Sequence, residues 1–149
     1  MSHVANVEIQ IKDLHALRSA CEALGLEFVE NQTTYAWYGQ WMDDWHTTDA
    51  AVTNGYDEKD FGKCEHAIKV PNSSYEIGVV KNPNGVGFRL IYDTWGENGR
   101  KVSEQLGGKS LTKLKNEYAV AVTTKQLMVQ GFRVKRSTKA GKIVLKGER

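Results

Sequence analysis

The feature that most constrains the fold is a pair of alternating segments joined by a short turn. "YEIGVVK" (75–81) and "VGFRLIYD" (86–93) flank "NPNG" (82–85), a strong signal for a β-hairpin. Side chains alternate between the two faces of a strand. The second segment therefore places three large apolar residues on one face, namely Phe88, Leu90 and Tyr92. We predict two antiparallel strands here.

The start of the chain predicts a strand followed by a helix. Residues 4–11, "VANVEIQI", alternate between apolar and polar positions, as in a strand with one wet face. Asp13 is placed as a helix N-cap and Gly25 as the residue that ends the helix. Between them, apolar residues recur at helical spacing: Leu14, Leu17, Cys21 and Leu24.

The C-terminal third predicts a second helix and a last hairpin. The helix runs from about Leu111 to Gln130, with a buried stripe formed by Leu114, Tyr118, Ala121, Val122 and Met128. "FRVKR" and "KIVLK" then pair around "STKAG". Tight turns between the later strands favour antiparallel pairing. The predicted fold class is therefore α+β, an antiparallel sheet covered on one face by two amphipathic helices.

Length and composition favour one soluble domain. The chain has 149 residues, and we expect residues 1–149 to form a single domain. No apolar run approaches the roughly 18 residues of a membrane span, and residues 1–6 lack the pattern of a signal peptide. We expect a cytoplasmic protein without membrane contact. The two cysteines, Cys21 and Cys64, are expected to be reduced.

The charge is distributed unevenly along the chain. Residues 1–100 hold 8 basic and 15 acidic side chains, a balance of −7, whereas residues 101–149 hold 12 and 3, a balance of +9. A basic segment can attract phosphates, so nucleic acid is a candidate partner of residues 101–149. The other interpretation is that the two regions attract each other within one fold or between two copies in a homo-oligomer.

The segment "YAWYGQWMDDWH" (35–46) holds three of the four tryptophans. Gly39 divides it, so Trp37 is predicted to belong to the sheet, whereas Trp41 and Trp45 lie four residues apart beyond the break. Tryptophan is enriched both in stacking sites and in protein interfaces. The residues predicted to bind an anionic ligand combine aromatic rings with arginines: Trp41, Trp45, Tyr38, Trp95, Arg89 and Arg133.

Residues 43–66 also crowd together groups that bind metals. The candidate ligands of a transition metal are Asp43, His46, Cys64 and His66. Cys64 and His66 would share one face if they lay in one strand. No spacing matches an established metal motif, and a solvated acidic loop is the alternative. We expect no other cofactor, because the glycines at 85, 87, 96 and 99 are assigned to turns rather than to a phosphate loop.

Several segments resemble an uncharacterised family of cyanobacterial, plastid, bacterial and tailed-phage proteins. They are the opening "MSHVANVEIQIKDLHALRSACEALGLEFVE", "YEIGVV", Asp-x-Trp-Gly at 93–96, Lys-x-x-Tyr-Ala at 115–119 and "QGF-V" at 130–134. The resemblance covers Met1 to about Leu145. It implies no activity, because none is assigned to the family. Residues 41–65 resemble an acidic and aromatic insertion of the phage-type members, which implies a phage-encoded protein acting in the host cytoplasm.

Binding is favoured over catalysis. We predict an accessory protein that captures a host protein or an anionic, nucleotide-like ligand through the aromatic insertion. Two alternatives stay open. One is a metal-dependent hydrolase that uses the Asp, His and Cys residues of the insertion, and the other is a nucleic-acid-binding module that uses the basic C-terminal third.

Overall fold

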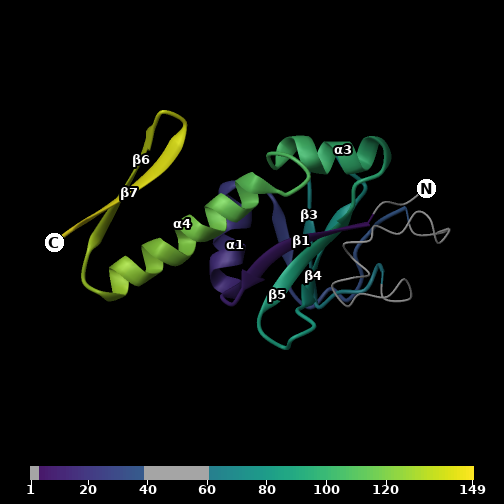
Figure 1. Ribbon diagram of the computed structural model, residues 1–149, viewed down its shortest axis with the longest axis horizontal. Helices are drawn as coiled ribbons and strands as arrows, with labels where there is room; N and C mark the ends of the chain where they lie inside the picture. The colour runs from purple at the N-terminus through teal and green to yellow at the C-terminus, as the bar shows by residue number, and fades with distance from the viewer. Residues whose placement is uncertain (1–3, 39–60) are drawn as a thin grey trace.

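A computed structural model describes residues 4–38 and 61–149 of the chain. Within these residues the elements follow the order β1 (Val4–Ile11), α1 (Leu14–Ala23), β2 (Glu27–Val29), β3 (His66–Lys69), β4 (Glu76–Lys81), β5 (Phe88–Asp93), α3 (Gly96–Gln105), α4 (Thr112–Val129), β6 (Arg133–Lys139) and β7 (Lys142–Glu148). The first five strands form one antiparallel sheet in the order β1-β5-β4-β3-β2, and β6 and β7 form a separate hairpin (Figure 1). The predicted α+β class is confirmed.

The predicted central hairpin is present between β4 and β5. Its turn is closed by backbone hydrogen bonds from Asn82 N to Gly87 O (3.0 Å) and from Gly85 N to Asn82 O (2.9 Å). Gly85 and Gly87 both have positive φ, and a Cβ on Gly87 would lie 2.8 Å from the carbonyl oxygen of Ile11. Glycine is therefore required at this approach to β1.

Helix α1 begins and ends where its capping residues predict. The Asp13 carboxylate accepts a hydrogen bond from Ala16 N at 3.0 Å, which satisfies one free donor of the first turn. At the other end Gly25 has φ +72°, Gly25 N donates to Glu22 O, and Leu26 N donates to Cys21 O. These two bonds are those of a Schellman motif.

One face of the sheet is covered by helices. The main core joins Val7, Ile68, Ile77, Leu90 and Tyr92 of the sheet to residues of all three described helices: Leu17 and Cys21 of α1, Val102 of α3, and Leu114 and Tyr118 of α4. The two predicted helices are thus confirmed as a cover for one face. Burying a large apolar side chain contributes about 1.5–3 kcal/mol, so this layer dominates the stability of the sheet.

Helix α3 is an element that the sequence did not predict, since Gly96 and Gly99 were assigned to turns. Gly99 is buried within the helix, where any Cβ would collide with the carbonyl group of Thr94. Val102 is the buried apolar anchor of α3, and exposed ion pairs one turn apart cover the outer side. Helix α3 is therefore held by the close approach of Gly99 to Thr94. It lacks the regular spacing of apolar residues from which a helix is predicted in a sequence.

The second face of the sheet is covered by irregular chain. Tyr35, Phe61 and Cys64 pack with Val80 and Ile91 in a smaller cluster, against which Trp37 is partly buried. The Trp37 ring meets the Phe61 ring edge to face at 5.9 Å. Trp37 was expected in a sheet strand, but in its segment only an isolated bridge from Thr34 to Lys63 is formed. Its packing against the core is as expected.

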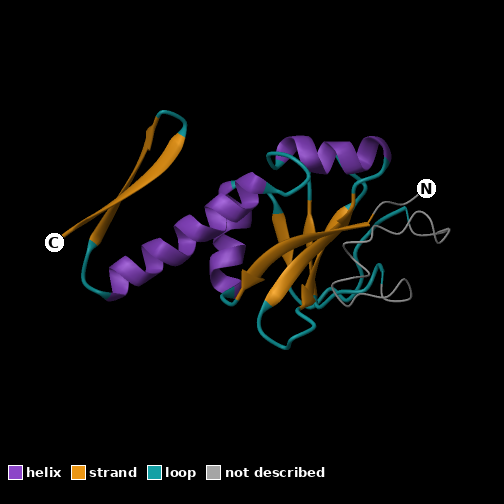
Figure 2. Cartoon of the chain, viewed as in Figure 1, coloured by secondary structure: helices purple, strands orange, loops and turns teal. Residues whose placement is uncertain are grey.

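Helix α4 projects beyond the sheet and carries the β6–β7 hairpin at its far end (Figures 1 and 2). Leu114 and Tyr118, in its first half, are buried as predicted. Met128 was predicted to be buried as well, but it is 62% exposed, and Val129 is 82% exposed. The prediction for Met128 is wrong because the body of the protein ends before the last turns of the helix. Neither α4 nor any other described helix is both long enough and apolar enough to cross a membrane.

Candidate functional site

Two members of the predicted ligand set lie together at the end of β5. The rings of Tyr38 and Trp95 are 5.0 Å apart in an edge-to-face arrangement. The fully buried carboxylate of Asp93 accepts hydrogen bonds from Tyr38 N (3.1 Å) and from Trp95 N (2.9 Å). Burial, with a smaller contribution from the nearby Asp93, raises the pKa of Tyr75 to about 12. One carboxylate thus fixes both backbone segments, and Tyr38 stays 43% exposed.

The other predicted ligand residues do not join this aromatic pair within the described residues. Arg89, on β5, donates from Nε to Asn82 Oδ1 beside the central turn. Arg133 lies on β6, in the hairpin at the far end of α4. Trp41 and Trp45 lie outside the described residues. The aromatic part of the predicted site therefore has a partial counterpart in the structure, whereas its two arginines lie elsewhere.

The predicted metal ligands Cys64 and His66 pack in different places. Cys64 belongs to the cluster on the irregular face, where its thiol donates to Gln32 O at 3.2 Å. The His66 ring lies against Phe28 and Phe88, which pack on the helical face, and its Nδ1 accepts from Asn31 N at 2.9 Å. The expected shared face is not formed, because Cys64 precedes strand β3 and does not follow its alternation.

Burial raises the pKa of the Cys64 thiol to about 12, with a smaller effect from Glu65. Asp43 and His46 lie outside the described residues. In the part of the chain that the structure describes, no three His, Cys, Asp or Glu side chains converge as a metal site would require.

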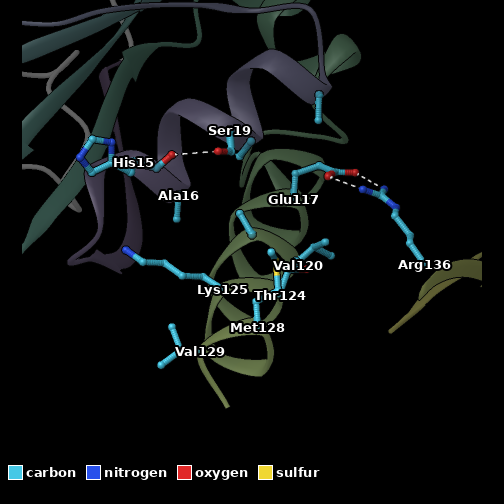
Figure 3. Close-up of a pocket in the computed structure, with 13 residues that line it drawn as sticks. His15, Ala16, Ser19, Glu117, Val120, Thr124, Lys125, Met128, Val129 and Arg136 are labelled. Carbon is cyan, nitrogen blue, oxygen red and sulfur yellow. Dashed lines mark hydrogen bonds and ion pairs between the residues drawn. The ribbon is translucent and has the colours of Figure 1, made fainter. Parts of the chain in front are cut away.

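A groove of about 730 Å³ lies between α1, α4 and β6 (Figure 3). Small and apolar side chains line much of it, including Ala16, Ala20 and Met128. Its charged residues are engaged at the rim, since Arg136 pairs with Glu117, and Lys125 with Asp13. Ser19 donates to the carbonyl of His15 in the same helix. The groove offers apolar surface rather than a set of reactive groups.

The β6–β7 hairpin has a strongly basic side. Residues 132–149 hold seven basic side chains and one carboxylate, a side-chain balance of +6. The register fixes which residues share a face, because directly paired residues point the same way. The face opposite α4, here called the basic face, consists of Arg133, Lys135, Ser137, Lys139, Lys142, Val144, Lys146 and Glu148.

Two pairs of lysines lie directly across from each other on the basic face. Lys135 pairs with Lys146, and Lys139 pairs with Lys142. All four are exposed. Glu148 approaches the first pair, at 3.4 Å from Lys135 Nζ and 3.7 Å from Lys146 Nζ. Within the described residues, Lys139 and Lys142 have no carboxylate partner.

The other face of the hairpin explains why the basic face points outward. Its residues are partly buried and mainly apolar: Phe132, Val134, Ile143 and Leu145. On the same face Arg136 makes a bidentate ion pair with Glu117 of α4, and this pair raises the pKa of Arg136 above its usual value. The Arg136–Glu117 pair therefore joins this face of the hairpin to α4, and the exposed lysines lie on the opposite face.

The sequence prediction named the basic region 101–149 and, among ligand residues, Arg133, but it did not single out Lys139, Lys142 or Lys146 of the basic face. The signal was present, since the alternation of "FRVKR" and "KIVLK" around a turn at Ala140 and Gly141 determines which lysines face each other.

Comparisons of the chain with family models, with curated proteins and with solved structures give no match. The interpretation therefore depends on the geometry.

Proposed function

We propose that the protein binds nucleic acid without catalysing a reaction, and that the basic face of the β6–β7 hairpin is its contact surface. The observation that carries the proposal is the direct opposition of like charges in the pairs Lys135–Lys146 and Lys139–Lys142. Like charges directly opposite each other destabilise a hairpin, and Glu148 approaches only the first of the two pairs. A polyanion that neutralises both pairs removes this repulsion, so the arrangement favours the bound state.

The charge of the rest of the chain supports the same conclusion. Residues 1–100 carry a balance of −7, so they repel a nucleic acid while the hairpin attracts it. The hairpin also lies at the end of a projecting helix (Figure 1). The sign of the charge along the chain therefore favours contact of a polyanion with the hairpin rather than with residues 1–100.

A titration with fluorescently labelled DNA and RNA tests this proposal. The double variant Lys139→Ala/Lys142→Ala removes one pair and should bind roughly fiftyfold more weakly at 100 mM salt, because two phosphate contacts are lost. The matched control Lys63→Ala/Lys69→Ala removes two exposed positive charges from the body of the protein and should bind normally. Equal losses in both variants would contradict the assignment to the hairpin. Binding only to phosphatidylserine vesicles would replace nucleic acid by a membrane surface.

A second candidate function is capture of a partner by the aromatic segment, and the Tyr38–Trp95 contact is the observation that favours it. Tyr38 comes directly before residues 39–60 and presents a half-exposed ring beside Trp95. The partner would be a host protein or an anionic, nucleotide-like molecule, as expected for a phage-encoded accessory protein. Trp41→Ala and Trp45→Ala should then abolish stabilisation by a nucleotide in a thermal-shift assay without changing the melting temperature of the free protein. Unfolding of both variants would assign these tryptophans to the core.

A further inference from the structure

We infer that the nucleic acid is double-stranded DNA and that the β6–β7 hairpin lies across its major groove. This inference depends on the proposed function and adds the substrate class and the mode of docking. The basic face lacks the side chains that single-stranded nucleic acids require. Its eight residues include no aromatic ring, whereas proteins that bind single strands stack the bases on aromatic side chains. The face is therefore suited to phosphates held in a fixed duplex geometry.

The spacing of the lysine pairs matches the width of the major groove. The pairs Lys135–Lys146 and Lys139–Lys142 are four residues apart along β6. At about 3.3–3.4 Å per residue they are separated by roughly 13 Å. The major groove of B-form DNA is about 12 Å wide. Each lysine pair can thus reach the phosphate backbone on one side of the groove.

The hairpin geometry also distinguishes DNA from RNA. The major groove of an A-form duplex is deep and narrow, so side chains cannot enter it as they enter B-form DNA. On duplex RNA the hairpin could reach only one backbone at a time. Losing two phosphate contacts at 100 mM salt should then weaken binding roughly fiftyfold.

The experiment compares 30-base-pair duplex DNA, the same sequence as duplex RNA, and each single strand, under one salt condition. We expect duplex DNA to bind most tightly, roughly fiftyfold more tightly than duplex RNA at 100 mM salt. Equal binding of the duplexes and the single strands, with the same dependence on Lys139 and Lys142, would overturn the duplex DNA inference but leave nucleic-acid binding intact. Absence of binding to every probe would overturn both.

Discussion

Replacing the four lysines of the basic face, Lys135, Lys139, Lys142 and Lys146, by alanine should flatten the salt dependence of nucleic-acid binding. Phosphate contacts release condensed counterions, so the slope of log K against log[salt] is about −0.9 for each contact on duplex DNA. Arg133 and the four lysines supply five cations, and Glu148 offsets about one. The wild-type slope should therefore be about −3.6.

The magnitude is large enough to measure by fluorescence anisotropy. Between 50 and 200 mM salt, four contacts reduce the affinity by about 150-fold. With the four lysines removed, only Arg133 remains opposite Glu148, and the affinity should change by no more than about fourfold over the same range.

Either of two results would refute the assignment of the basic face as the contact surface. A wild-type slope shallower than about −2 would show that the protein contacts fewer phosphates than the basic face has cations. An unchanged slope in the four-lysine variant would place the contact surface elsewhere. The variant should remain folded, because its four side chains are exposed and their removal relieves the like-charge opposition. A circular dichroism melt checks this directly.

Three further predictions concern other parts of the molecule. Glu148→Gln removes the carboxylate of the basic face and should raise the affinity for duplex DNA and steepen the salt slope by about one contact. Gly99→Ala places a Cβ against the carbonyl of Thr94 and should destabilise the fold by about 1–3 kcal/mol, as measured by urea unfolding. Unchanged stability would mean that α3 shifts without cost. Burial raises the pKa of both Cys21 and Cys64 from 9.0 to about 12, so the stability linked to the neutral thiols is present below pH 9 and is lost as the pH rises towards 12. Urea unfolding at pH 8 and pH 10 should show it, and in native protein at pH 8 neither thiol should react with a thiol reagent.

The elements predicted correctly are those whose local chemistry specifies them. Asp13 and Gly25 mark the two ends of α1 because a carboxylate satisfies the first-turn donors and glycine accepts a positive φ. The Asn-Pro-Asn-Gly turn and the alternation around it specify β4 and β5. The basic character of the C-terminal hairpin followed from its composition.

The candidate sites were less predictable because they depend on contacts between distant segments. The prediction treated Tyr38, Trp95, Arg89 and Arg133 as one set, yet only the first two meet, through the buried carboxylate of Asp93. Spacing along the chain carries no information about such a meeting. Cys64 and His66 are two residues apart, but they pack on different faces because the strand begins after Cys64.

By itself, the sequence determined the α+β class, the ends of α1, the central turn, and the alternation that separates the basic and apolar faces of the last hairpin. These features depend on interactions within a few residues, and side-chain type is enough to specify them. Only the tertiary structure decided that α3 is a helix, that Met128 is exposed, and that the lysine pairs point away from the body. Those outcomes depend on where the sheet and its helices end, and therefore on packing between segments that lie far apart in the chain.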